Sequence, residues 1–306
     1  MIAECAVDPE VLAEWKYFES LSADFGVGQG RLLCEFPSKW RRLFLDKTCV
    51  LEARGINSTR QAAMLLDQYQ HGGFRRALVG STRDYPKGLN WREAARSTKP
   101  SFDLIVHAGE LEATNEVRAG EILRRNPPFA QPRQTEVRRV STDLIACGWE
   151  CYRRAKEIYV VDPFFKPQEA YFGKVLGHLL SRIERESSRP KRIEVHTKMP
   201  GTYIAKTQRE HWRRWSLEHL PSDWTIKVVH WEKLETGSRL HARYILTDIG
   251  GLDYNWGTDE DPQEITQVSL LDDPFWERLY HRFCWPENSI PDVFRKFPDR
   301  IFEIVG

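Results

Sequence analysis

A histidine and an arginine two positions apart carry the clearest chemistry in this chain. They lie in residues 239–247, whose apolar pattern predicts a β-strand. Side chains alternate across a strand, so His241 and Arg243 are expected to project from the same face. A guanidinium can hold two phosphate oxygens in a fork, and an imidazole can attack phosphorus or carry a proton. The pair therefore predicts a phosphate-handling site, unless His241 is a structural histidine held by a neighbouring strand.

Two further positions are candidates for binding substrate. Asp162 falls near the end of a strand predicted over 157–165, and ligand crevices form at the carboxyl ends of parallel strands. The alternative is a carboxylate that caps the turn before Pro163. His196 and Lys198 are also two apart on a predicted strand, 192–198, and are expected to line its end; a second catalytic half built from them is the less favoured alternative.

The segment that begins at His241 resembles the HxK(x)4D signature of the phospholipase D superfamily. Arg243 stands where that signature has lysine, and Gly257-Thr258 is similar to its trailing Gly-Ser. The resemblance implies that His241 is a nucleophile that becomes a phosphohistidine, that Arg243 clamps the phosphate, and that Asp248 is a supporting carboxylate. Expected substrate-binding positions in the following segment are Asn255, Thr258 and Glu260.

A more specific likeness covers about residues 140–270. The stretches Val161–Phe165, Ile193–Lys198, His241-x-Arg243 and Gly251–Asp253 resemble the phospholipase-D-like C-terminal domain found after MIT modules and in bacterial relatives. The eukaryotic domains of that kind bind membranes and are not regarded as hydrolases. An active site of the superfamily joins two histidines across a two-fold axis, and this chain has one good motif. Either two protomers form a homodimer or no full site exists.

The elements that must position these residues alternate between helix and strand. Beyond residue 137, helices and apolar strands predict an α/β domain, residues 137–306, with a phospholipase D-like, mixed and largely parallel sheet flanked by helices. A polar stretch with three prolines, 126–134, marks the boundary. Residues 1–130 are expected to form a smaller mixed α+β domain of unknown role, with a helix that starts after Asp8. Gly26, Gly28 and Gly30 resemble a fragment of a phosphate loop, but the GK[ST] that should follow is missing.

Composition limits the partners. The net charge of +1 hides a split, because residues 137–219 hold 17 Lys and Arg against 10 Asp and Glu, a net of +7, and residues 220–306 have a net of −7. A basic face for nucleic acid is therefore possible. The cluster 211–215 (HWRRW) could stack bases or lie on a lipid interface, but two tryptophans three apart on a helix are more often packing.

The remaining composition argues against metals, membranes and secretion. The six cysteines show no CxxC pair and are read as buried thiols. Asp259–Asp261 could hold a cation, but a loop with this charge is more often a solvated surface. No cofactor and no metal is expected. The N-terminus has acids where a leader would be basic, which favours a cytoplasmic and prokaryotic protein.

These observations predict a metal-independent phosphodiesterase or nuclease that acts on DNA or RNA as a homodimer, with a role in prokaryotic defence. The alternative is a non-catalytic module that binds phosphate groups of nucleic acid, of lipid or of a partner protein. A third reading is a subunit of a larger protein complex. The +7 stretch favours nucleic acid over membrane lipid.

Overall fold

The chain divides into two compact units, Met1–Arg133 and Gln134–Gly306. The computed structural model describes residues 1–71, 74–81, 83–122, 131–187, 190, 192–201, 204–232, 240–285, 291 and 298–306. Most of the proline-rich stretch expected to separate two domains, 126–134, lies outside the described residues, because the structure describes only 131–134 of it.

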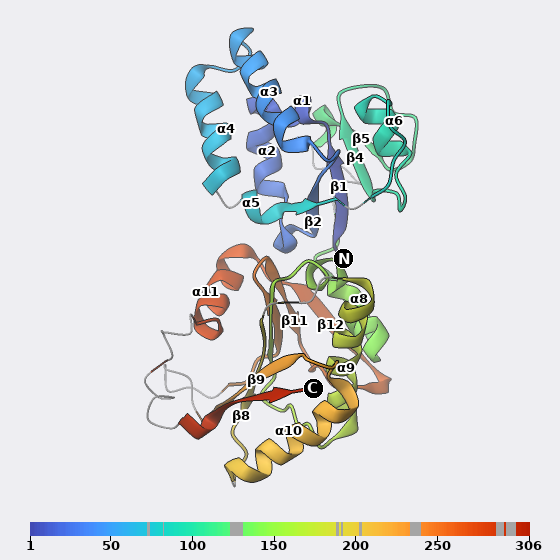
Figure 1. Cartoon of the computed structure of the whole chain (residues 1–306). Coiled ribbons are helices and arrows are strands. Elements are labelled where there is room, and N and C mark those ends of the chain that lie inside the picture. The colour runs from blue at the N-terminus through green and yellow to red at the C-terminus, as the bar shows by residue number, and fades with distance from the viewer. Residues whose placement is uncertain are drawn as a thin grey trace. The chain divides into compact units, whose positions relative to one another are not determined.

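The N-terminal unit has a five-stranded sheet in which every ladder is parallel. The strand order is β3-β2-β1-β4-β5, so the chain reverses direction across the sheet between β1 and β4 (Figure 1). The sequence predicted a mixed α+β domain here; helices and strands are both present, but because every ladder is parallel the unit is α/β. The strands are β1 (Ala3–Val7), β2 (Arg31–Glu35), β3 (Leu78–Gly80), β4 (Leu104–His107) and β5 (Glu116–Arg118).

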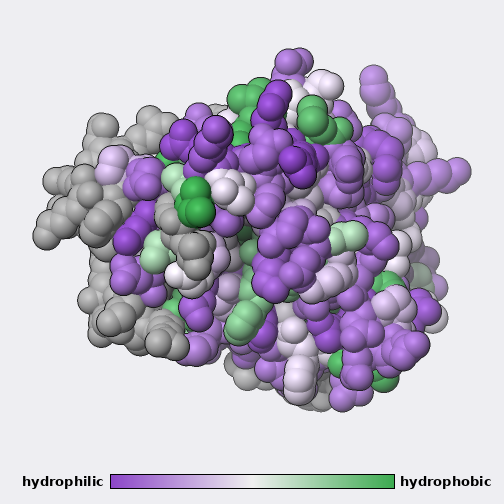
Figure 2. All heavy atoms as spheres, turned by 90° about the horizontal axis from the view of Figure 1, so that it is seen from below, coloured by the Kyte–Doolittle hydropathy of each residue, from purple (hydrophilic) through white to green (hydrophobic). Residues whose placement is uncertain are grey.

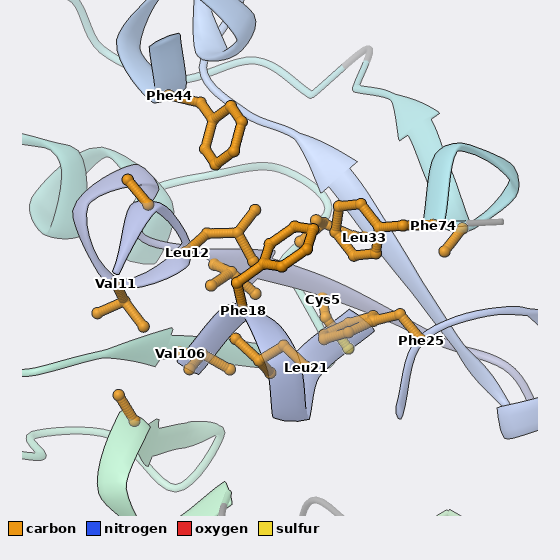
Figure 3. Close-up of a cluster of buried hydrophobic side chains, with 14 of the residues drawn as sticks. Cys5, Val11, Leu12, Phe18, Leu21, Phe25, Leu33, Phe44, Phe74 and Val106 are labelled. Carbon is orange, nitrogen blue, oxygen red and sulfur yellow. The ribbon is translucent and has the colours of Figure 1, made fainter. Parts of the chain in front are cut away.

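In the part of this unit that the structure describes, the helices are α1 (Pro9–Ala13), α2 (Trp15–Asp24), α3 (Trp40–Ala53), α4 (Thr59–His71), α5 (Phe74–Ala77), α6 (Trp91–Arg96) and α7 (Ala119–Ile122). The expected helix after Asp8 is two helices, since Glu14 is extended and ends α1. Phe18 of α2 and Leu12 of α1 pack against Leu33 of β2 in the core (Figure 3).

The glycines of the suspected phosphate loop precede β2 and do not follow a strand. Gly26 and Gly30 flank a short 3-10 turn, η1 (Val27–Gln29), which contains Gly28 and leads from α2 into the amino end of β2. Ligands of parallel sheets bind outside the carboxyl ends of the strands. The phosphate-loop reading of Gly26, Gly28 and Gly30 is therefore wrong on geometry.

The C-terminal unit contains an eight-stranded sheet in the order β13-β9-β8-β7-β10-β11-β12-β6. The expected mixed α/β architecture is confirmed, and its parallel part is confined to the ladders β7-β8 and β8-β9. The other five ladders are antiparallel. The strands are β6 (Gln134–Arg139), β7 (Glu157–Val161), β8 (Arg192–Lys198), β9 (Thr225–Trp231), β10 (Tyr244–Thr247), β11 (Gly250–Tyr254), β12 (Asp261–Leu270) and β13 (Ile301–Val305).

Helices cover both faces of this sheet. Tyr159 and Val161 of β7 pack against α11 (Asp273–Phe283) in one core cluster. The helices α8 (Ser141–Tyr152), α9 (Ala170–Glu186) and α10 (Ala205–His219) contact one another in the order α8-α9-α10. A short 3-10 turn, η3 (Pro298–Arg300), precedes β13.

The tryptophans of α10 are part of the core. Trp212 is fully buried and stacks on Phe165, with ring centroids 5.1 Å apart, and Trp215 is buried beside it. The packing alternative for the cluster 211–215 is therefore confirmed, and only its arginines are exposed. Among the described residues, no helix has both the length and the apolar character needed to cross a bilayer.

Candidate functional site

Asp162 lies directly after β7, at the carboxyl edge of the parallel strands, and is fully buried. Its Oδ1 accepts the Phe164 amide at 2.9 Å, and its Oδ2 accepts the Thr258 hydroxyl at 2.9 Å and the Thr258 amide at 3.2 Å. Burial raises the pKa of this carboxyl, while these hydrogen bonds and the nearby Arg243 oppose the rise. Asp162 thus caps the turn before Pro163 and also ties the loop at Thr258 to the strand end.

Arg243 is held in place by three contacts. Its Nη1 donates to the Asn255 carbonyl at 2.9 Å, and its Nε is 4.0 Å from Asp162 Oδ1. The guanidinium carbon lies 4.7 Å from the centroid of the Phe164 ring, a cation–π arrangement. The side chain keeps 24% of its surface exposed. The cation is therefore both positioned and reachable from solvent.

Gly257 allows the loop to come this close to Arg243. Its φ of +114° lies where side chains are rarely tolerated, and an added Cβ would be 2.6 Å from Asp259 Oδ1 and 3.2 Å from Arg243 Cδ. The loop 255–259 therefore packs closely against the Arg243 side chain.

His241 is exposed, and no other described residue forms a hydrogen bond or ion pair with it. The expected strand over 239–247 starts only at Tyr244, because its partner β7 ends at Val161. Residues 240–243 lie outside the ladder, and Arg239 lies outside the described residues. The strand alternation that was expected to place His241 beside Arg243 therefore does not apply to these two residues.

A cavity of about 250 Å³ lies at the carboxyl ends of β7 and β8. The Phe164 ring lines it and is also the ring over which Arg243 lies. Lys198, the last residue of β8, lines the same cavity and is exposed, as is Lys166, and Gln208 in the first turn of α10 also lines it. The predicted position of Lys198 at the strand end thus agrees with the structure.

Asp248 does not belong to this site. It follows β10 at the end opposite to Arg243, where it accepts the amides of Lys156 at 2.8 Å and Glu157 at 3.2 Å. Five residues of extended chain span about 17 Å. Asp248 holds the amino end of β7, so its expected role as a supporting carboxylate of the catalytic site is not supported by its position.

His196 is also removed from the site, because its side chain is fully buried among Trp231, Phe283 and Trp285. Its Nδ1 accepts the Trp231 indole N–H at 3.0 Å, which leaves Nε2 as the protonated nitrogen, 3.2 Å from Glu194 Oε2. Burial lowers the pKa of His196. A neutral imidazole locked in this way cannot line a binding surface or act as a second nucleophile.

The three remaining predicted residues act mainly through the loop 255–260. Thr258 bonds Asp162, and Asn255 offers its carbonyl to Arg243 while its side chain is exposed. Glu260 accepts the Ser141 amide at 2.9 Å and its hydroxyl, and it lies 3.5 Å from Lys174 Nζ. Burial opposes ionisation of Glu260, but these partners outweigh it and lower its pKa. Glu260 therefore fixes the start of α8 and is not directed at a ligand.

Two exposed aromatic residues lie in the segments that hold Arg243 and were not singled out from the sequence. Phe164 is 44% exposed and Trp256, next to the carbonyl that Arg243 binds, is 63% exposed. Large apolar side chains at an arginine are a usual means of stacking bases. The only sequence signal was their position, one beside the predicted strand end and one in the motif's trailing loop.

The described residues contain no group of three or more His, Cys, Asp or Glu able to hold a metal ion. Asp259 of the acidic loop pairs with Arg139 at 2.6 Å. All six cysteines are free thiols, and Cys5, Cys34, Cys147 and Cys151 are buried. The site is thus built from the carboxylate of Asp162, the guanidinium of Arg243 and the ring of Phe164.

Comparison with known proteins gives only distant likenesses. No protein-family model and no curated protein matches the chain. Among solved structures, TrmBL2, an archaeal chromatin protein, is similar at 13% identity and a TM-score of 0.27, covering 54% of this chain and 57% of that one. A polyphosphate kinase from Porphyromonas gingivalis is similar at 10% identity and a TM-score of 0.32, covering 58% and 35%. The chain therefore spans about half the length of TrmBL2 and about a third of the length of the polyphosphate kinase.

Proposed function

We propose that the C-terminal unit binds the phosphate groups of a nucleic acid at the carboxyl edge of β7 and β8. The observation that carries this proposal is the placement of Arg243, whose guanidinium is fixed by Phe164, Asp162 and Asn255 and remains partly exposed. A fixed guanidinium loses little conformational entropy when it binds a phosphate. Arg243 is the phosphate ligand, and Lys198, which lines the same cavity as Phe164, is a second cation.

The surroundings favour nucleic acid over lipid as the source of the phosphate. The face of α10 carries exposed Lys206, Arg209, Arg213 and Arg214. The view onto α10 from below is largely hydrophilic, with hydrophobic residues only in small separate patches (Figure 2). Phe164 and Trp256 offer rings for unstacked bases. A lipid interface would instead call for a contiguous apolar surface.

Hydrolysis is the second candidate, and the exposure of His241 favours it. In that case the imidazole attacks phosphorus, forms a P–N bond and displaces one ester oxygen, and water then cleaves the P–N bond. The departing oxygen needs a proton from a second imidazole. Since His196 is buried, that imidazole would be His241 of a second copy in a homodimer. The reaction would then proceed without a metal ion.

One pair of assays separates the two candidates. Binding of a labelled oligonucleotide is followed by fluorescence anisotropy, and its cleavage is followed in EDTA, for the wild type and for His241→Ala. The binding module predicts the same affinity for both proteins and no cleavage by either. Cleavage by the wild type that disappears with His241→Ala would replace the binding module with the hydrolase. If the wild type neither binds nor cleaves DNA or RNA, both candidates fail.

A further inference from the structure

The N-terminal unit contains a polar cavity of about 550 Å³ beside β2. Its lining includes the carboxylate of Glu35, the last residue of β2, and the guanidinium groups of Arg41 and Arg75. Tyr69 and His71, from the last turn of α4, complete the polar wall. The cavity therefore lies near the carboxyl end of a parallel strand, where ligands of such sheets bind.

The two arginines are available to a ligand. The guanidinium carbon of Arg41 lies 5.5 Å from the centroid of the Tyr69 ring, and Arg75 Nη1 donates to the Gln70 carbonyl at 3.1 Å. Both side chains are exposed, and among the described residues no carboxylate lies within ion-pair distance of either. Two guanidinium groups at one polar cavity form a good receptor for an oxyanion.

The start of α3 adds to the positive potential of this cavity. Arg41 is in the first turn of this helix of 14 residues, where acidic side chains are usually favoured. This turn contains no acidic residue, and no side chain caps it. Free amides at a helix N-terminus also attract anions. The two arginines and the helix terminus thus all favour a negatively charged ligand.

Glu35 gives the cavity a second kind of recognition. Its Oε1 accepts the Tyr69 hydroxyl at 2.9 Å, and no described residue hydrogen bonds to its Oε2. Burial and this bond raise the pKa of Tyr69, so the phenol stays protonated and remains a donor. The free carboxylate oxygen would repel a bare anion but would accept a hydrogen bond from a hydroxyl group.

We propose that this cavity binds a phosphate monoester that carries hydroxyl groups, as nucleotides and sugar phosphates do. Arg41 and Arg75 hold the phosphate, and Glu35 accepts a hydroxyl of the sugar. This site is independent of the surface around Arg243, so Arg243→Ala must leave it intact.

Isothermal titration calorimetry of the full chain tests the proposal with four probes: ribose 5-phosphate, AMP, ribose and inorganic phosphate. The two phosphate esters should bind better than ribose or inorganic phosphate. Arg41→Ala and Arg75→Ala should each weaken the binding of the esters by about tenfold or more, since each removes a charge-assisted hydrogen bond. Arg60→Ala, an exposed arginine on α4 outside the cavity, should change nothing.

Glu35→Gln separates hydroxyl recognition from simple attraction of anions. It should weaken the binding of ribose 5-phosphate while the affinity for inorganic phosphate stays the same or rises. AMP that binds more tightly than ribose 5-phosphate would assign a nucleotide, and equal affinities would assign a sugar phosphate. Absence of ester binding at millimolar concentration, or wild-type affinity in a folded Arg41→Ala/Arg75→Ala double variant, would overturn the proposal. Thermal denaturation verifies that each variant is folded.

Discussion

The guanidinium of Arg243 lies 4.7 Å from the centroid of the Phe164 ring, which brings a residue just before β10 onto one just after β7. Tyr244 pairs with Val161 at the end of the antiparallel ladder, and Arg243 and Asp162 are the next residues beyond that pair. The sheet itself therefore brings the cation, the carboxylate and the ring together.

Gly257→Ala should weaken phosphate binding without removing any charged group. The new Cβ would meet Asp259 and the Arg243 side chain, and a residue with φ of +114° is strained. We expect a loss of about 1–3 kcal/mol in the free energy of unfolding, measured by urea denaturation. Gly120→Ala, where an added Cβ meets nothing within 4 Å, is the control. Unchanged affinity in a folded Gly257→Ala protein would show that the loop does not position Arg243.

Asp248→Ala should affect stability and leave phosphate binding unchanged. The substitution leaves the amides of Lys156 and Glu157 without their acceptor, at a cost of about 1–3 kcal/mol. Paired denaturation and anisotropy measurements give both quantities. Loss of binding with normal stability would return Asp248 to the binding site.

Phe164→Ala should reduce affinity for single strands more than for duplexes. Stacking on an aromatic ring contributes about 1–3 kcal/mol per base, and only unpaired bases can reach such a ring. Tyr171→Ala is the control, because Tyr171 is also an exposed aromatic residue. Phe172→Ala cannot serve as one, because Phe172 is buried. Equal losses for single and double strands would limit Phe164 to supporting Arg243.

Acid should destabilise the N-terminal unit through Glu116. This buried carboxylate accepts Arg96 Nη2 at 3.0 Å, and chiefly that partner lowers its pKa to about 2. Because the folded-state pKa lies below the unfolded value of about 4.3, the unfolded chain binds more protons between these two pH values. The stability that Glu116 contributes is therefore full above about pH 4.3 and is lost as the pH falls towards 2.

Thermal denaturation of the wild type and Glu116→Gln from pH 7 to pH 2 measures this contribution. The difference in Tm between the two proteins should shrink as the pH falls through that window. A difference that is constant with pH would mean that ionised Glu116 does not stabilise the fold.

The sequence predicted regular strands well and close contacts poorly. The strand expected over 192–198 has those bounds, and all of it except its two end residues is buried in the parallel part of the sheet. The strand β11 begins with Gly250-Gly251, a pair that is more typical of a loop. Gly251 is needed there because Leu246, Leu271 and Trp276 pack against it, which is a tertiary requirement.

The site was predicted in part. Arg243 was expected from the phosphate motif and Asp162 from the strand-end rule, and the structure brings Arg243, Asp162 and Thr258 together. His196 had the same local pattern as His241 but is buried by α11 and the Trp285 side chain, which come much later in the chain. Spacing along one strand cannot show which of its faces a later helix will cover.

The affinity of Arg243→Ala for a single-stranded oligonucleotide, measured by fluorescence anisotropy at several salt concentrations, tests the central claim most directly. We expect the wild type to bind less tightly as the salt concentration rises. The Arg243→Ala variant should lose about 10-fold to 100-fold in affinity, and its salt slope should be smaller than that of the wild type by about 1. Arg278→Ala, an exposed arginine on α11, should behave as the wild type. Wild-type affinity and slope in a folded Arg243→Ala protein would contradict the account.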